Sequence, residues 1–355
     1  MAKAAQSLLK WLHNFKLPPT MTIGVSMQVD PNPDTSSWPI SVQTHDVDDQ
    51  AIALHGWSQR YQQLSPGRFN GAVSSAQLSN VEVFFESSNQ HMHQVGTPPR
   101  GKVVLGLPLH TEGMGWLAGR EFDRDSVVAI DAGEEFRFRT PHQLLLGAFV
   151  CEKDHLMEAA SRLDVEAPIQ AALTAGSLHL ESAIADELRG LFADVRAWMS
   201  SGQLCEESEF TRAAFAESML NCWLRSFKGV DSLGRSFTHT RRQRRGLAVR
   251  AQRYLVEHVS DLPDVAELCR VLQVQDRVLQ YCFRDVFGLT PNAFLRNMRL
   301  HEVRRAIRAD VNQDESIGDI AFRWGFWHLS RFATEYRQLF GERPSDTRRT
   351  SCPTG

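Results

Sequence analysis

The stretch from Ser316 to Ser345 constrains this chain most, because it is typical of two short helices joined by a tight turn. Ser316 and Asp319 have the spacing of a capping box, which satisfies free amides at a helix start. Gly325 supplies a residue able to turn with positive φ. Gly341 is expected to end the second helix, and Pro344 to prevent its resumption. The second helix would bury one continuous apolar face, formed by Leu329, Phe332, Ala333, Tyr336, Leu339 and Phe340.

The opposite face of that second helix is polar. Its side chains can donate to or accept from base edges and phosphates: His328, Ser330, Arg331, Thr334, Arg337 and Gln338. A short helix, a glycine turn and a second helix with such an outer face describe a helix-turn-helix DNA reader. The alternative interpretation is an ordinary helical hairpin with a solvated face.

A second copy of this pattern precedes the first. Asp264–Leu272 is predicted to form its first helix, and Gly288 to end its second. The buried stripe of that second helix would be Val278, Leu279, Cys282, Phe283, Val286 and Phe287. Thr290 and Pro291 then cap a long helix to about Ala309, a rigid strut between the units. Two readers on one strut can enter successive major grooves, roughly 34–36 Å apart.

From about Leu247 to Arg348 the chain resembles the DNA-binding domain of AraC/XylS-type transcription regulators. The matching positions of the second unit are Ile317, Asp319-Ile320-Ala321, Gly325-Phe326, Ser330, Phe332, Tyr336-Arg337, Phe340-Gly341 and Pro344. The first unit departs from the family pattern. Gln273 replaces the usual turn glycine, Gln275 the capping serine and Cys269 an alanine, which implies a looser unit that reads less sequence.

The outer faces of the two second helices are expected to contact DNA. Arginine suits guanine O6/N7, and glutamine suits adenine N6/N7. Arg284 and Arg337 are assigned to phosphates, the salt-dependent part of binding. The residues assigned to base edges are Arg277, Gln280 and Tyr281 in the first unit, and Ser330, Arg331 and Thr334 in the second.

Charge is distributed unevenly along the chain. From residue 236 onward there are 20 arginines and no lysine, against 14 acidic residues, a net charge of +6. The preceding residues hold 19 basic and 28 acidic side chains, a net charge of −9. A basic C-terminal third behind an acidic body is typical of a nucleic-acid reader joined to another domain.

The preceding part is expected to be a β-barrel or sandwich sensory domain with flanking helices, so the fold class is α+β. Short strands at regular spacing run from 69 to 151, and helices from 152 to 230. A helix is also predicted over His55–Leu64. The amphipathic helices Leu180–Ser200 and Glu209–Phe227 can pair with each other or with a second subunit. The predicted divisions are an N-terminal helix and loop extension (1–50), an effector-binding and dimerisation domain (51–230), a basic linker (231–246) and the double helix-turn-helix domain (247–349).

The sensory half resembles that of the ethanolamine-operon regulator within this family. The resemblance lies in Tyr61, Leu64, Pro66-Gly67, Phe69, Gly71, VEVF and EFRFRTP. It implies ethanolamine and adenosylcobalamin as effectors, with no cofactor otherwise required.

Candidate effector-binding residues lie on predicted strand and helix faces. Glu82, Phe84 and Glu86 share one strand face by period two, and can line a pocket for an amine cation. The alternative for this triplet is a solvent-facing edge. Trp57 and Tyr61, four residues apart, are interpreted as core packing or as ligand contacts.

The sequence holds no enzyme signature, neither Gly-x-Ser-x-Gly nor a phosphate loop nor a dinucleotide fingerprint. His91-Met92-His93 resembles the first metal motif of cupin barrels, but the glutamate expected after it is missing, so no metal site and no catalytic residue are predicted. Six scattered cysteines without a Cys-x-x-Cys pair favour a reducing cytoplasm. No run of about eighteen apolar residues suggests a membrane span.

The favoured hypothesis is an effector-responsive activator of a catabolic operon. As a homodimer formed through residues 180–228, it would bind paired or repeated half-sites in double-stranded DNA and contact RNA polymerase. Two alternatives stay open: a metal-dependent cupin-like enzyme with a helical appendage, and a DNA-binding regulator without a small-molecule effector.

Overall fold

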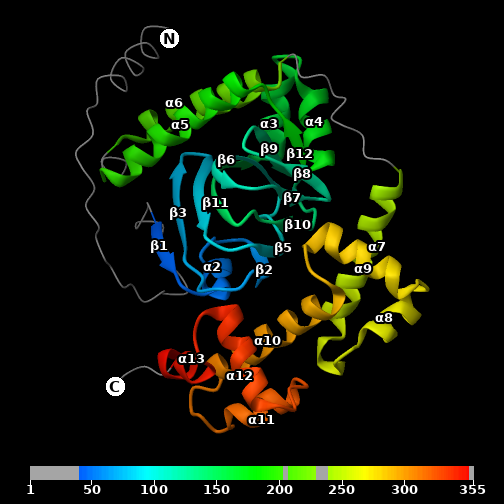
Figure 1. Ribbon diagram of the computed structural model, residues 1–355. Helices are drawn as coiled ribbons and strands as arrows, with labels where there is room; N and C mark the ends of the chain where they lie inside the picture. Colours follow the sequence, from blue (N-terminus) through cyan, green and yellow to red (C-terminus); the bar gives the residue numbers. More distant parts are fainter. Residues whose placement is uncertain (1–39, 203–206, 229–238, 352–355) are drawn as a thin grey trace.

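The computed structural model describes residues 40–202, 207–228 and 239–351, which form a β-sandwich followed by an all-helical region (Figure 1). Most of the expected N-terminal extension and the first part of the expected linker lie outside these ranges. The structure differs from the predicted divisions at two of their three boundaries. Residues 40–50 belong to the sandwich domain, because β1 (Ile40–Thr44) pairs with β3 (Gly71–Leu78). The helix α7 begins at His239, within the stretch expected to be a linker.

The sandwich consists of two sheets whose paired strands are antiparallel. The larger sheet has the order β1-β3-β4-β11-β6-β9-β12, with β4 Val81–Ser88, β11 Gln143–Glu152, β6 Lys102–Glu112, β9 Ser126–Ile130 and β12 Ser177–His179. The smaller sheet has the order β2-β5-β10-β7-β8, with β2 Ser58–Gln63, β5 Met92–Thr97, β10 Phe136–Arg139, β7 Gly115–Leu117 and β8 Arg120–Phe122.

Both faces of the larger sheet are covered. Because side chains alternate along a strand, Phe84 of β4 faces the smaller sheet while Phe85 faces the helices. Those helices are α3 (Lys153–Ser161), α4 (Glu166–Ala175), α5 (Ser182–Ser200) and α6 (Glu209–Ser226), which lie across the outer face (Figure 1). The triplet Glu82, Phe84 and Glu86 is therefore buried inside the sandwich, and its interpretation as a solvent-facing edge is wrong.

The predicted helix over His55–Leu64 is also wrong, since this segment contains strand β2. Its residues pair with β5 from Ser58↔Thr97 to Gln63↔Met92. Trp57 and Tyr61 suggested a helix because they are four apart. A separation of four also fits a strand, where every second residue shares a face, so the spacing did not distinguish the two structures.

The C-terminal helices lie where the apolar periodicity places them. They are α7 (His239–Glu257), α8 (Val265–Leu272), α9 (Asp276–Phe287), α10 (Pro291–Ala309), α11 (Ile317–Arg323) and α12 (Leu329–Phe340), with a 3-10 turn at Val259–Asp261. A further helix, α13 (Pro344–Ser351), was not expected. Proline prevents continuation of the preceding helix but suits the first turn of a new one, so Pro344 begins a helix instead of only ending one.

Candidate nucleic-acid interface

The second helix-turn-helix unit has the predicted caps. The Ser316 hydroxyl accepts a hydrogen bond from the Asp319 amide (3.1 Å) and donates to the Asp319 carboxylate (2.6 Å). Gly325 turns the chain with φ +80°. Ile320 and Ala321 of α11 pack with Phe332 and neighbouring side chains in one core, which fixes α12 against α11.

The first unit is built in the same way, with one strained residue at its turn. Asp264 caps α8, accepting from the Glu267 amide at 2.7 Å. Gln273 holds the turn at φ +54°, a conformation that is costly for any residue other than glycine. Gln275, at the start of α9, makes no side-chain capping bond. His328, at the start of α12, makes no such bond either, so the strained Gln273 is the feature that sets the first unit apart from the second.

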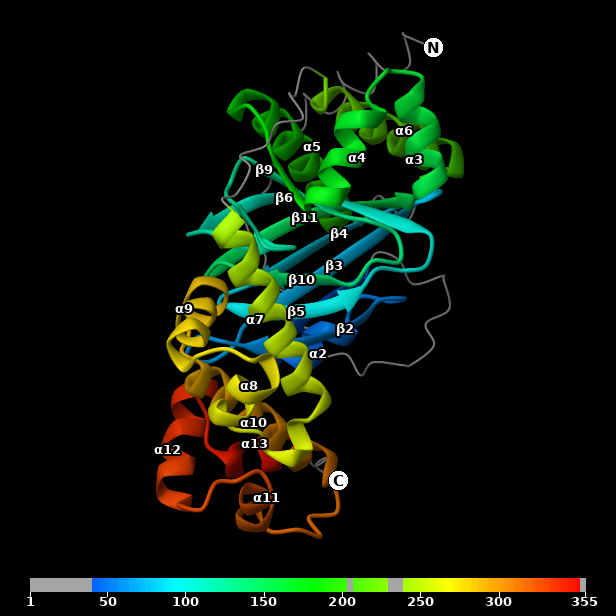
Figure 2. The same ribbon diagram turned by 90° about the vertical axis from the view of Figure 1, so that its right-hand side faces the viewer.

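The two reader helices, α9 and α12, are each twelve residues long and each end at a glycine with positive φ, Gly288 and Gly341. Counted from these glycines, Arg284 and Arg337 occupy equivalent positions four residues earlier. α10 connects the two units, and α9 and α12 lie on the same side of the molecule (Figure 2).

The candidate DNA contacts lie on the outside of these helices. Gln280 is partly exposed, and the other seven are exposed: Arg277, Tyr281, Arg284, Ser330, Arg331, Thr334 and Arg337. The structure therefore brings four candidates together on each reader helix.

Two of these arginines already have partners within their own helices. Arg331 bonds Glu335 at 2.9 Å while its side chain stays 67% exposed. Arg277 donates to the Tyr281 hydroxyl at 3.3 Å and lies over its ring. Such exposed contacts contribute little stability, so they orient the guanidinium groups without holding them away from DNA.

Sequence reasoning missed Glu335 and the aromatic pair Phe322 and Trp327. Glu335 also bonds Arg296 of α10, so it links the second reader helix to the strut. Trp327 is 71% exposed and stacks on Phe322 beside the start of α12. The available signal in the sequence was a tryptophan just before a predicted helix. The apolar pattern alone did not show whether this tryptophan is exposed or belongs to the core.

The last turns of both reader helices are held by the N-terminal domain. Arg139 of β10 donates to the Val286 carbonyl of α9 at 2.9 Å. The Gln63 side chain of β2 donates to the Leu339 carbonyl of α12 at 2.6 Å, and the Gly67 amide donates to the same carbonyl at 3.1 Å. The last carbonyl groups of a helix have no hydrogen-bond donor within that helix. The sandwich domain supplies the donors for these two carbonyls.

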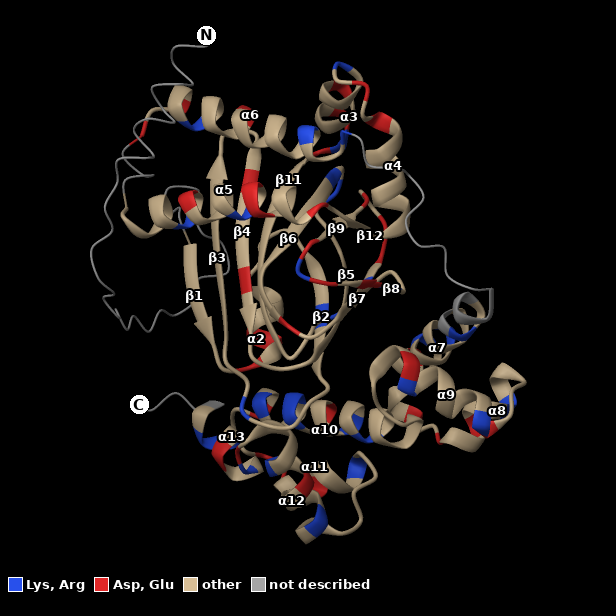
Figure 3. Ribbon diagram, turned by 45° about the horizontal axis from the view of Figure 1, so that its top comes forward, with Lys and Arg blue, Asp and Glu red and all other residues tan. Residues whose placement is uncertain are grey.

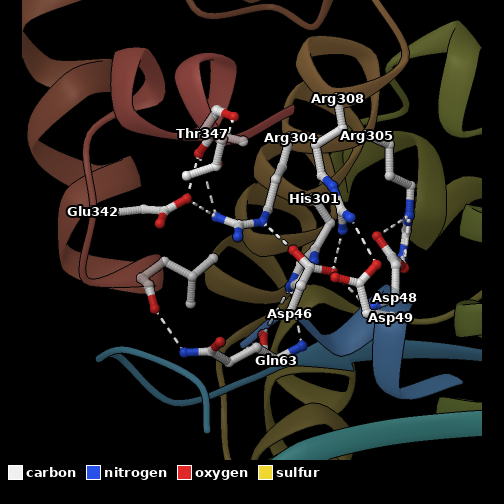
Figure 4. A network of polar contacts seen from close by, with 12 residues as sticks. Asp46, Asp48, Asp49, Gln63, His301, Arg304, Arg305, Arg308, Glu342 and Thr347 are labelled. Atoms are coloured by element: carbon white, nitrogen blue, oxygen red, sulfur yellow. Dashed lines mark hydrogen bonds and ion pairs between the residues drawn. The ribbon is translucent and has the colours of Figure 1, made fainter. Parts of the chain in front are cut away.

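A second contact joins the halves through charge. Figure 3 shows arginines along α10 near the acidic residues of α2 (Val47–Ile52), and Figure 4 shows their bonds. The pairs are Arg304–Asp46 (2.5 Å), Arg308–Asp46 (2.8 Å), Arg305–Asp48 (2.7 Å) and Arg308–Asp49 (2.6 Å). The predicted strut is therefore also the docking surface for the N-terminal domain.

The arginines of this contact favour the charged form of the Asp46 carboxyl. Burial alone would raise the pKa of the Asp46 carboxyl, but Arg304 and Arg308 outweigh it and lower that pKa. Removing one partner of such a pair would leave an uncompensated buried charge.

Four of the five predicted effector-binding residues lie together in the structure. Trp57, Tyr61, Phe84 and Glu86 line a cavity of about 30 Å³ inside the sandwich, together with Gln94. Glu86 accepts from the side-chain amides of Gln50 and Gln94, both at 3.2 Å, and from Tyr61, while burial raises its pKa. A volume of this size holds about two waters.

The third residue of the triplet stands apart. Glu82 does not line the cavity, and burial raises its pKa to about 7 against the opposing effect of Lys102.

Both histidines of the His91-Met92-His93 motif pack against other groups. His91, just before β5, lies edge-on to the ring of His142. His93 is fully buried, and its ring lies edge-on to Phe287 of α9 and Phe294 of α10. Across the described residues, no cluster of three or more His, Cys, Asp or Glu is arranged to hold a metal. None of the helices in these ranges combines the length and apolar character that a bilayer crossing needs.

Comparison with known proteins points to the C-terminal region. Residues 268–350 match a family model described as a helix-turn-helix domain. A protein of Rhodococcus erythropolis named as the probable thc operon regulatory protein is 40% identical over 106 residues, which are 30% of this chain and 32% of that protein. The XylDLEGF operon transcriptional activator of Pseudomonas putida is 28% identical over 149 residues, 42% of this chain and 46% of that protein.

The chain thus spans about a third to a half of the length of these curated relatives. Among solved structures, the AraC-like transcriptional activator CuxR is similar with a TM-score of 0.40 and 14% identity, over 74% of this chain and 94% of CuxR. The relatives from Rhodococcus erythropolis and Pseudomonas putida are both named as regulators of an operon.

Proposed function

We propose that this chain, whose C-terminal region is a helix-turn-helix domain of the AraC/XylS type of transcription regulators, is a sequence-specific DNA-binding activator that responds to a small molecule. One observation carries the proposal. Two equivalent reader helices lie on one side of the molecule and carry exposed arginines, while their last turns are bonded to a separate sandwich domain. A change in that domain therefore acts directly on the readers.

Base readout is assigned to the outer residues nearest the start and middle of each reader helix. These are Arg277, Gln280 and Tyr281 in α9, and Ser330, Arg331 and Thr334 in α12. Arg331 would exchange its bond to Glu335 for a bidentate contact with guanine. Arg284 and Arg337, equivalent by position, would each bind a phosphate. The exposure of these side chains supports the assignment.

The wider role rests on similarity. A relative named as an operon transcriptional activator supports activation of an operon. A catabolic operon as target, RNA polymerase as a partner and a homodimer as the binding unit stay predictions from the sequence. Because α5 and α6 bury their apolar faces on the larger sheet, dimerisation would use their outer surfaces, where Phe210 is exposed.

The nature of the effector is a separate question. The resemblance to the ethanolamine-operon regulator stays a prediction. A cavity of about 30 Å³ at Glu86 supports ethanolamine weakly, and adenosylcobalamin is far larger than that cavity.

The proposal is tested by selecting DNA from a random library with the purified full chain. We expect enrichment of a motif with two elements about one helical turn apart, roughly 10 base pairs. Retention of random DNA without an enriched motif would leave only electrostatic binding and would contradict sequence-specific recognition.

A further inference from the structure

Apolar side chains are exposed where the second unit turns into its reader helix. Trp327 is 71% exposed and stacks on Phe322 of α11, with 6.1 Å between the ring centroids and 20° between the ring planes. Leu329, the first residue of α12, was expected on the buried face of that helix, but it is 42% exposed. Large apolar side chains that gather on a surface mark an interaction site more often than single ones do.

These three side chains form one surface along α11. An added Cβ at Gly318 would lie 3.4 Å from Leu329 Cδ1, so Leu329 packs against Gly318. Phe322 follows Gly318 by four residues and therefore lies on the same face, one helical turn later. Trp327 stacks on Phe322, so the surface continues from Leu329 across α11 to the indole ring. We call Phe322, Trp327 and Leu329 the apolar patch.

Trp327 is an additional residue of the second unit. In the first unit one residue, Val274, separates the turn residue Gln273 from the N-cap residue of α9. In the second unit two residues, Phe326 and Trp327, separate Gly325 from the N-cap residue of α12. Val274 and Phe326 each pack against the core of their own unit. The extra residue is therefore the tryptophan, and it points outward.

Charge and position favour DNA as the occupant of the apolar patch. Arg323 and Arg331 flank it in the sequence, with side chains 54% and 67% exposed. Both belong to exposed ion pairs, which contribute little stability and can be exchanged for phosphate contacts. The patch also lies at the start of α12, and the first residues of a reader helix are those that contact base edges.

The major groove offers an indole ring one apolar group. Guanine, cytosine and adenine present hydrogen-bonding atoms there, and thymine adds its C5-methyl group. Stacking on Phe322 holds the indole ring before DNA binds, so less conformational freedom is lost on contact.

We propose that Trp327 contacts the C5-methyl group of a thymine in the DNA element read by the second unit. The proposal rests on the proposed function, since it adds an apolar specificity contact to the polar base readout of α12. The first unit, with one residue fewer at its turn, makes no equivalent contact.

The test replaces single thymidines of the selected duplex by deoxyuridine, which lacks only the methyl group and keeps the same base pairing. Fluorescence anisotropy with the full chain measures the affinity of each duplex. At one position, uracil should weaken binding about three- to fourfold, the effect of one buried methyl-sized group. That position should lie within about three base pairs of the one at which Arg331→Ala relaxes discrimination.

Trp327→Ala should bind the thymine duplex at least about threefold more weakly than the wild type and should not distinguish it from the uracil duplex. Trp327→Phe, with a smaller ring, should give an intermediate difference, and it replaces Trp327→Ala if that variant does not fold. The control is Met114→Ala, which removes a 44% exposed side chain of the sandwich between β6 and β7. It should distinguish the two duplexes as the wild type does.

Three outcomes would overturn the inference. The wild-type chain tolerates uracil throughout the selected site, the Trp327 variant keeps the full wild-type difference, or its affinity for the site is unchanged. The last result would assign the apolar patch to a protein partner. Failure of the proposed function is distinguishable from these outcomes. Retention of random DNA without an enriched motif contradicts both proposals, whereas an enriched motif that tolerates uracil contradicts only the thymine contact.

Discussion

Asp46, the N-cap residue just before α2, and Arg304 of α10 form an ion pair between the two halves of the chain, with 2.5 Å between Oδ2 and Nε. Their side chains are only 6% and 9% exposed. The same carboxylate caps α2, accepting from the Asp48 amide at 2.7 Å. One buried carboxylate thus stabilises a helix of the N-terminal domain and fastens it to α10, the helix that joins the two helix-turn-helix units.

Asp46→Asn should destabilise the protein strongly. It removes the charge that compensates Arg304 and Arg308, which would cost about 3–5 kcal/mol for a buried pair. Urea unfolding measures the loss. Asp49→Asn is the matched control, since its side chain is 43% exposed and pairs with Arg308 alone, so its cost should stay below about 1 kcal/mol. Equal losses in the free energy of unfolding of the two variants would show that the burial of Asp46 does not determine the effect.

Arg331→Ala and Arg337→Ala should affect DNA binding differently. Loss of a base contact should cost about 1–3 kcal/mol on the selected site and relax discrimination there. Loss of a phosphate contact should weaken binding to all sequences alike and reduce the salt slope by about one. Fluorescence anisotropy on selected and scrambled duplexes at several salt concentrations distinguishes them. Identical behaviour of the two variants would refute the division into base and phosphate contacts.

Gln273→Gly should stabilise the first reader unit. Gln273 has φ +54°, a backbone conformation in which a side chain costs about 1–2 kcal/mol. Glycine removes this strain, but its greater freedom in the unfolded chain offsets part of the gain. We expect a gain of up to about 1 kcal/mol in the free energy of unfolding. Gly325→Ala, with φ +80° in the second unit, is the reciprocal control and should lose stability. A loss in Gln273→Gly would mean that the glutamine side chain makes a stabilising contact.

Glu82→Gln should remove a pH dependence of stability. Burial raises the pKa of Glu82 from 4.5 to about 7 in the folded state. Because the pKa of Glu82 is higher in the folded state, proton binding to Glu82 stabilises the folded protein. This contribution is complete below pH 4.5 and is lost as the pH rises through 7. The stability of the variant relative to the wild type should therefore increase as the pH rises from 5 to 8. Thermal unfolding at several pH values measures this difference. Glu158→Gln, exposed on α3, should keep the wild-type profile. A wild-type profile in Glu82→Gln would show that another group titrates.

The sequence predicted the reader helices almost to the residue because their signals are local. Ser316 and Asp264 start helices by bonding amides three residues away, and Gly288 and Gly341 end them with positive φ. The strand β2 was missed because the Trp57–Tyr61 spacing fits helix and strand alike. Only pairing with β5, whose partner residues lie 29 to 39 positions later (Gln63↔Met92 to Ser58↔Thr97), decided between them.

Sequence by itself therefore determined the two helix-turn-helix units and the alternating strands, since caps, turns and periodicity act over a few residues. Tertiary structure alone decided how the halves meet. Asp46 and Arg304 are 258 positions apart, and neither residue carries a local sign of the other. The burial of this pair arises only when the two halves dock, because desolvation depends on the assembled surface and not on neighbours along the chain.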